Sequence, residues 1–253
     1  MRAIVRGLIV PLAFFLSWEL ASRAGLISAE TFSRPSDILA VGLAALADGS
    51  LLLATFQTLQ SAFVGICLAV LIGVPVGLFI GISPVAGLTI SPTLEALRPV
   101  PPVALIPLSL LIFGFGVSME AAVVAFACVW PVMIATTAAV GSLEGRLAEV
   151  ARTLEMSMLD YVRKIVLPAA LARIAVGVRI AVGIAIVVAV TVEIVVNPRG
   201  LGYGMIIAQQ SLRPDLMYAQ LFWIGVVGWA INWTFLKFDH AFLSHFSMTR
   251  GRA

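Results

Sequence analysis

The stretch Gly141–Arg173 reads GSLEGRLAEVARTLEMSMLDYVRKIVLPAALAR, and it concentrates charged residues that are scarce elsewhere in the chain. It is too polar to span a membrane. Four of its apolar residues recur at the spacing of one helical face: Leu143, Leu147, Val150 and Leu154. Three charged residues lie off that stripe: Glu149, Arg152 and Glu155. The stretch therefore predicts a short helix with one apolar face.

The composition around this stretch is that of a membrane protein. Of 253 residues, 61% are hydrophobic and 11% are charged, with a mean hydropathy of +1.08. A soluble domain carries about 25% charged residues. The net charge of +3 is too small to indicate a nucleic-acid partner, and Cys67 and Cys128 lie in apolar runs without the neighbours that a metal site needs. Lipid is therefore the expected surroundings of the chain.

Six apolar segments are long enough to cross a bilayer, which takes about 20 residues each. They are residues 4–21, 55–80, 88–113, 121–140, 171–196 and 218–238, in one predicted permease domain over 1–253 with a loop at 141–170. Prolines interrupt the third segment after Arg98, so we expect a kinked or split helix there. Between the first two segments, Ser36 is a predicted N-cap of a short helix that ends near Ala47.

The distribution of basic residues predicts the orientation. With the N-terminus inside, the inner segments carry Arg2, Arg6, Arg146, Arg152, Arg163, Lys164, Arg173, Lys237, Arg250 and Arg252. The outer segments carry Arg23, Arg34, Arg199 and Arg213. Because cytoplasmic loops hold the excess of Lys and Arg, both termini and the loop 141–170 are predicted to be cytoplasmic.

Small residues recur every four positions in the second segment: Gly65, Ala69, Gly73, Gly77 and Gly81. Such a stripe allows another helix to approach closely in lipid, where burial of apolar area alone does not drive association. We therefore expect tight helix packing along this face.

The second half of the polar loop also has helix signals. Ser157 followed by Asp160 is a capping-box pattern, and Pro168 is suited to the first turn of the next long helix. From the residues alone, two interpretations stay open. The loop helix lies on the inner leaflet against its own bundle, or its apolar face docks into a groove of a soluble partner.

The loop resembles a motif of the membrane subunits of binding-protein-dependent ABC importers, E-A-A-x3-G-x9-I-x-L-P. Glu149, Val150 and Ala151 begin the match, and Ile165, Leu167 and Pro168 end it, without gaps. Val150 replaces an Ala, and Glu155 replaces the Gly that would end the helix with positive φ. The resemblance implies that the loop contacts an ATPase through Glu149, Val150, Ala151, Arg152, Leu154, Glu155, Ile165, Leu167 and Pro168.

Three further stretches resemble the nitrate/sulfonate/taurine branch of these permeases: Arg98–Pro107, Phe113–Gly116 and Arg199–Gly202. The resemblance implies an all-α type I permease fold with about six transmembrane helices and a cytoplasmic coupling helix, in a bacterial inner membrane. It further implies a homodimer, two ATPase subunits that use ATP and Mg, and an extracytoplasmic binding protein that delivers a small anion. The chain itself is expected to bind no cofactor or metal and to have no catalytic residues.

Three residues are predicted to line or gate the pathway. Glu193 is an ionisable group near the outer end of the fifth segment, where charges are costly and often functional. The alternative is an interfacial residue that reaches water or pairs with Arg199. Pro101 and Pro102 lie at the predicted break, which is tolerated only against protein or a water-filled cavity.

Two other functions remain as alternatives. An ATP-independent secondary transporter or channel would need several buried charges along its spans, and a membrane-embedded enzyme would need His, Asp or Ser clustered at one depth.

Overall fold

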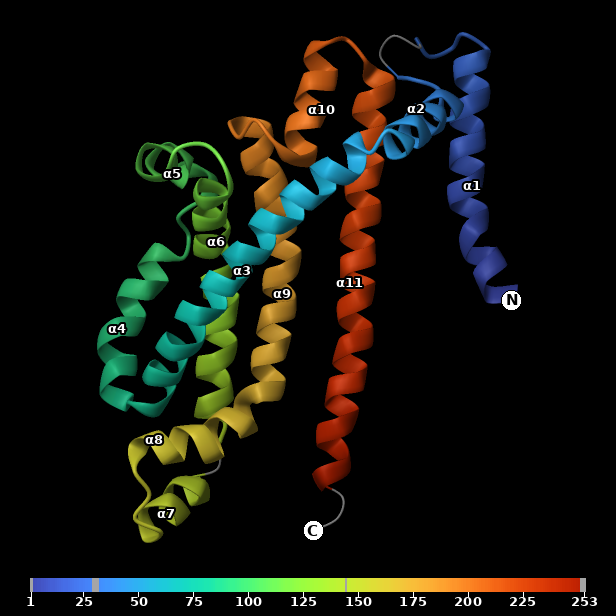
Figure 1. The fold of residues 1–253 in the computed structure, drawn as a ribbon. Coiled ribbons are helices and arrows are strands. Elements are labelled where there is room, and N and C mark those ends of the chain that lie inside the picture. Colours follow the sequence, from blue (N-terminus) through green and yellow to red (C-terminus); the bar gives the residue numbers. More distant parts are fainter. Residues whose placement is uncertain (1, 29–31, 144, 251–253) are drawn as a thin grey trace. The chain divides into compact units, whose positions relative to one another are not determined.

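Every regular element of the described chain is a helix. The computed structural model describes residues 2–28, 32–143 and 145–250 (Figure 1). In chain order the elements are α1 (Arg2–Arg23), α2 (Pro35–Ala47), α3 (Ser50–Ile82), α4 (Pro84–Leu97), the 3₁₀-helix η1 (Pro102–Leu105), α5 (Ile106–Phe113), α6 (Val117–Gly141), α7 (Gly145–Thr153), α8 (Met158–Tyr161), the π-helical turn η2 (Val162–Val166), α9 (Leu167–Val195), α10 (Gly200–Gln210) and α11 (Pro214–Arg250). Glu144 of the predicted loop and the basic residue Arg252 lie outside the described residues.

The six predicted spans all fall on helices, namely α1, α3, the α4–α5 pair, α6, α9 and α11. Within the described residues, three helical stretches are long and apolar enough to cross a membrane: Ser50–Ile82, Val117–Gly141 and Met158–Gln210. A fourth is the pair Pro84–Leu97 and Pro102–Phe113, which is bent by 84° at its break. The split predicted from the prolines is therefore confirmed, whereas membrane crossing by α1 and α11 stays a prediction.

The chain divides into two compact units, and each is described by itself. Unit 1 comprises Met1–Thr58 and Glu193–Gly228, and unit 2 comprises Leu59–Val192 and Trp229–Ala253.

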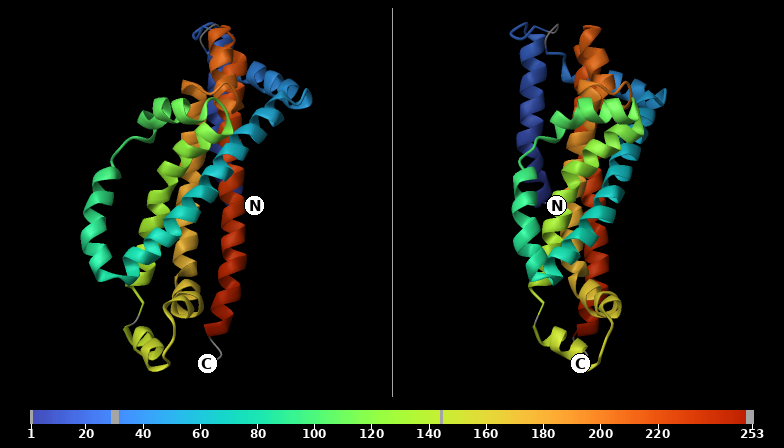
Figure 2. Two further views of the ribbon diagram at one scale, coloured as in Figure 1. Left: turned by 60° about the vertical axis from the view of Figure 1, so that its left-hand side comes forward. Right: turned by 90° about the vertical axis from the view of Figure 1, so that its left-hand side faces the viewer.

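In unit 2, α3 and α6 lie side by side (Figure 2), and the glycine stripe of α3 faces α6. A Cβ at Gly77 would fall 2.7 Å from the backbone oxygen of Met133, and one at Gly81 would fall 2.7 Å from the Cβ of Val140. The contacts on α6 advance in step with the glycines, so the two helices run parallel. Since real Cβ atoms do not approach so closely, these positions have no room for a side chain.

The second partner of α6 in this unit is α9, which runs antiparallel to it. A Cβ at Gly177 would fall 2.5 Å from the Cβ of Ala135, and the Cys128 thiol donates a hydrogen bond to the Ala181 carbonyl oxygen at 3.2 Å. With α3 and α9 on it, α6 is the most extensively buried helix of this unit, and it positions the walls of the cavities described below.

In unit 1, α2 begins differently from the prediction. Arg34 is the N-cap and provides no side-chain cap, while Ser36 lies inside the helix, so the predicted N-cap at Ser36 is wrong. The Glu19 carboxylate of α1 takes that role instead, accepting hydrogen bonds from the Ser36 amide at 3.1 Å and its hydroxyl at 3.0 Å. Pro35 has the fixed φ of a first helical residue, and an anion at a helix N-terminus is favourable, which explains the start two residues earlier than predicted.

Candidate functional site

The polar loop contains α7, and this helix ends in a Schellman motif. The Glu155 amide donates to the Arg152 carbonyl at 3.0 Å, and the Met156 amide donates to the Ala151 carbonyl at 3.0 Å. Glu155 itself has φ +50°, in the left-handed region. The turn therefore has the shape that the motif's usual Gly would give, and Glu155 bears a strain of about 1–2 kcal/mol.

The second half of the loop is helical, as predicted. The Ser157 hydroxyl accepts a hydrogen bond from the Asp160 amide at 3.2 Å, which confirms the cap, and Lys164 pairs with Asp160 at 2.8 Å. The helix then continues through the π-helical turn η2 into α9, with Pro168 as the second residue of α9. Proline has no amide to donate and its ring crowds the preceding turn, so widening that turn accommodates Pro168 without ending the helix.

The loop exposes apolar side chains. The exposed fractions are 49% for Val150, 66% for Leu154, 65% for Met158 and 61% for Leu159. Ala151, by contrast, is 6% exposed, so a larger residue here would have to displace its neighbours or protrude from the loop. Of the other predicted coupling residues, Glu149, Arg152, Glu155 and Pro168 are exposed, and Ile165 and Leu167 are half-buried.

Glu193 is 1% exposed, near the C-terminal end of α9 in unit 1. Its Oε1 accepts a hydrogen bond from the Thr58 hydroxyl at 2.7 Å, and its Oε2 accepts one from the Gly202 amide at 2.8 Å. The Thr58 oxygen also accepts from the Leu201 amide at 3.0 Å. Together the two side chains satisfy amides in the first turn of α10, where a negative charge is favourable.

Gly200 makes this arrangement possible. It has φ +87°, and a Cβ there would fall 1.9 Å from Oε1 of Glu193, so any other residue would displace the carboxylate. Its amide donates to the Gln57 side-chain oxygen at 2.9 Å. Glu193 thus has a positioning role within unit 1, and its side chain is buried in this structure. A gating role stays a prediction.

The break between α4 and α5 borders two cavities of unit 2, each of about 320 Å³. Arg98, Trp130 and Ile134 line both. Pro102 lines one of them, whereas Pro101 is an exposed residue that precedes η1. Of the two prolines predicted to line a pathway, the structure therefore brings Pro102 to a cavity wall.

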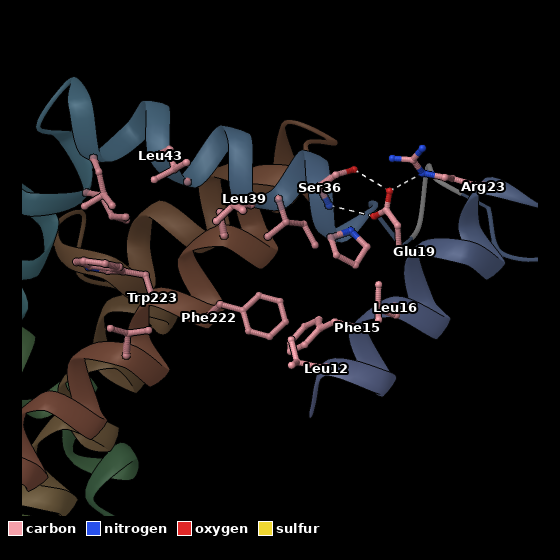
Figure 3. Close-up of a pocket in the computed structure, with 17 residues that line it drawn as sticks. Leu12, Phe15, Leu16, Glu19, Arg23, Ser36, Leu39, Leu43, Phe222 and Trp223 are labelled. Carbon is pink, nitrogen blue, oxygen red and sulfur yellow. Dashed lines mark hydrogen bonds and ion pairs between the residues drawn. The ribbon is translucent and has the colours of Figure 1, made fainter. Parts of the chain in front are cut away.

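A larger pocket of about 810 Å³ lies in unit 1, between α1, α2 and α11 (Figure 3). Its walls are mostly leucine and aromatic side chains, including Phe15, Phe222 and Trp223. The charged groups at its end, Glu19 and Arg23, pair with each other at 2.7 Å. A pocket with these walls and neutralised charges suits apolar matter such as lipid and offers little to a small polar solute.

Two residues that the sequence analysis did not single out occupy these sites. Arg98 was quoted only within the proline run, although it is the one cation inside the segment 88–113 and intramembrane charges are a functional signal. Thr58 has no local signal, because its role depends on α9 and α10. No group of three or more His, Cys, Asp or Glu side chains gathers within the described residues.

Comparison with known proteins agrees with this architecture. Residues 73–240 match the family described as the binding-protein-dependent transport system inner membrane component. The aliphatic sulfonates transport permease protein SsuC of Bacillus subtilis is 30% identical over 224 residues, which cover 88% of this chain and 81% of that protein. The nitrate import permease protein NrtB of Leptolyngbya laminosa is 30% identical over 175 residues, covering 69% and 63%.

Among solved structures, a chain of the MetNI methionine ABC transporter in an inward facing conformation has a TM-score of 0.65 at 20% identity. The match covers 76% of this chain and 95% of that one, and it establishes the type I permease fold. Permeases of this family are multi-pass, non-catalytic components that work with a separate ATPase and a solute-binding protein. The chain belongs to this family, as an inner membrane permease subunit of a binding-protein-dependent ABC importer of the nitrate/sulfonate/taurine branch.

Proposed function

We propose that this permease imports a small oxyanion, such as a sulfonate, taurine or nitrate, that a binding protein delivers from outside. SsuC and NrtB, each 30% identical to this chain, are named for aliphatic sulfonates and nitrate, and both solutes carry a negative charge on oxygen. An oxyanion is therefore the solute named for both relatives, although an aliphatic sulfonate is larger than nitrate.

The loop of α7 and α8 would be the contact with the ATPase. The strongest support is that the loop exposes four apolar side chains, those of Val150, Leu154, Met158 and Leu159. Apolar side chains exposed on two short helices and the turn between them are costly in water, and a groove on a partner protein would bury them. The loop holds no cofactor in this proposal, since ATP and Mg belong to the ATPase.

The assembly would contain two copies of this chain and two ATPase subunits. ATP binding would close the ATPase pair and draw the two loops together, opening the pathway outward, and hydrolysis would reverse the movement. A partner shifts such an equilibrium only by binding one state better than the other. With the excess of Lys and Arg inside, both termini and the loop would face the cytoplasm.

The test is substitution of Ala151 by Trp in the complete importer, reconstituted in liposomes with its ATPase and binding protein. Because Ala151 is 6% exposed, Trp would change the shape of the loop where the ATPase docks. Import should fall by at least about tenfold while ATP hydrolysis continues without stimulation by the loaded binding protein. Ala172→Trp, at an exposed position of α9, is the matched control. Normal import by the Ala151 variant would rule out the coupling assignment.

A further inference from the structure

The break between α4 and α5 lies at the middle of the neighbouring helices. Trp130 of α6 lines the cavity beside this break. It lies 13 residues after Val117, the first residue of α6, which is about 20 Å along a helix about 37 Å long. Ile180 and Ile184 line the same cavity from the middle of α9. Since α6 is about as long as a bilayer core is thick, the cavity lies near the membrane midplane.

Arg98 is the charged residue of this cavity. The rest of the lining is apolar apart from the indole of Trp130, and includes Pro102, Ile180 and Ile184. Among the described residues no ion-pair partner of Arg98 is found. Glu95, one helical turn earlier, lines only the neighbouring cavity together with Arg98 and forms no ion pair with it in the described part of the chain. A guanidinium at this depth is costly without an ion-pair partner, which makes it a functional residue by default.

The local backbone favours a cation at this point. Arg98 is the C-cap of α4, where the partial negative charge of the helix end attracts a positive group. The chain then turns by 84° into η1 and α5, so the Arg98 position is fixed by the break and not by a long flexible loop (Figure 1).

The neighbouring cavity is less suited to an anion. It shares Arg98 and Trp130 but also includes Glu95, whose carboxylate would repel a second negative charge. The cavity bordered by Pro102 and Ile184 has no acidic residue in its lining and a volume of about 320 Å³, at the lower end of ligand-site volumes. It therefore fits a small anion with a short apolar part.

We propose that Arg98 is a substrate-binding residue of the translocation pathway, which holds the oxyanion group of the solute in the cavity walled by Trp130, Pro102 and Ile184. The planar guanidinium donates two parallel hydrogen bonds to two oxygens of the sulfonate or nitrate group. The apolar walls accommodate the remainder of the solute. This inference rests on the proposed import of an oxyanion.

The experiment uses the complete importer in liposomes and labelled taurine, methanesulfonate and nitrate, each presented with the importer's own binding protein. Arg98→Gln should reduce uptake of the transported probe by at least about tenfold, because a charge-assisted pair of hydrogen bonds is lost. Arg98→Lys keeps the positive charge but loses the planar pair of donors. Its uptake should lie between that of the unaltered importer and that of Arg98→Gln. Arg23→Gln, at an exposed position of α1, is the control and should import normally.

ATP hydrolysis stimulated by the loaded binding protein is measured in parallel to check that each assembly is intact. Equal import by Arg98→Gln and the unaltered importer would overturn the inference and leave the proposed function standing. Loss of stimulated hydrolysis in both Arg98 variants would also overturn it, because the residue would then be structural. If the unaltered importer takes up none of the three probes, the proposed substrate class fails, and the inference fails with it.

Discussion

Replacement of Glu155 by Gly should make the end of α7 more stable. Glu155 has φ +50°, and an L-residue in the left-handed region costs about 1–2 kcal/mol. Gly removes that strain but loses about 0.5–1 kcal/mol more chain entropy on ordering. The strain is the larger of the two, so the net gain is about 0.5–1 kcal/mol.

The assay is amide hydrogen exchange of the loop in the purified permease. The Met156 amide reports on the turn, because its hydrogen bond to the Ala151 carbonyl closes the Schellman motif. A gain of about 0.5–1 kcal/mol should slow its exchange by a factor of roughly two to five.

Glu155→Ala is the matched control. It also removes the carboxylate, which is unfavourable at a helix C-terminus, but it keeps the Cβ and hence the backbone strain. The difference between the Gly and Ala variants therefore isolates the backbone contribution. Equal exchange in the two variants, or faster exchange in the Gly variant, would refute the strain at Glu155.

Three further predictions concern other parts of the chain. Gly77→Ala should destabilise the protein by about 1–3 kcal/mol, because its Cβ would fall 2.7 Å from backbone, and this is measured as a shorter half-life at raised temperature. Thr58→Val should cost about 1–3 kcal/mol in the same assay, since it removes partners of a buried carboxylate and a buried amide. Hydrogen bonds from the Ser50 side chain and amide lower the pKa of Asp48, so Ser50→Ala should raise that pKa toward its usual value, as followed by the carboxyl carbon shift in labelled protein. Because the folded-state pKa is the lower one, the contribution of Asp48 to stability is present above its usual pKa and is lost as the pH falls through the folded-state value.

Matched controls separate these effects from general damage. Gly183→Ala places a Cβ where no atom lies within 4 Å, and Thr89→Val removes an exposed hydroxyl that bonds its own helix at 2.8 Å. Half-lives as short as those of the Gly77 and Thr58 variants would contradict the packing and network arguments. An unchanged Asp48 titration in Ser50→Ala would contradict the assigned cause of the shift.

The helices and the break were predictable because their signals are local. Apolar length determines α3, α6 and α9, and the prolines after Arg98 determine the split. The turn between α3 and α4 is shorter than the interval between the predicted segments suggests, since Ser83 alone connects the two helices. Its hydroxyl caps α4 by accepting from the Ala86 amide at 3.3 Å.

The helix α10 was not predicted, and the reason is physical. Its N-cap, Arg199, provides no side-chain cap, and the groups that satisfy its first amides come from Gln57, Thr58 and Glu193. Such a start has no signature within a short window of sequence. The left-handed turn at Glu155 has no sequence signature either, because a non-Gly residue in that conformation is visible only in three dimensions.

The close contact of α3 with α6 has a practical consequence for measuring the transport cycle. At Gly65, Gly77 and Gly81 the backbone of α3 lies so close to α6 that no Cβ fits between them, so the two helices are expected to keep their separation during the cycle. Spin labels on the outward faces of these two helices should therefore give one narrow distance distribution whether or not nucleotide is bound to the ATPase. The distance between these two labels serves as an internal reference. A label distance that changes with nucleotide, while this one does not, can be assigned to movement elsewhere in the permease.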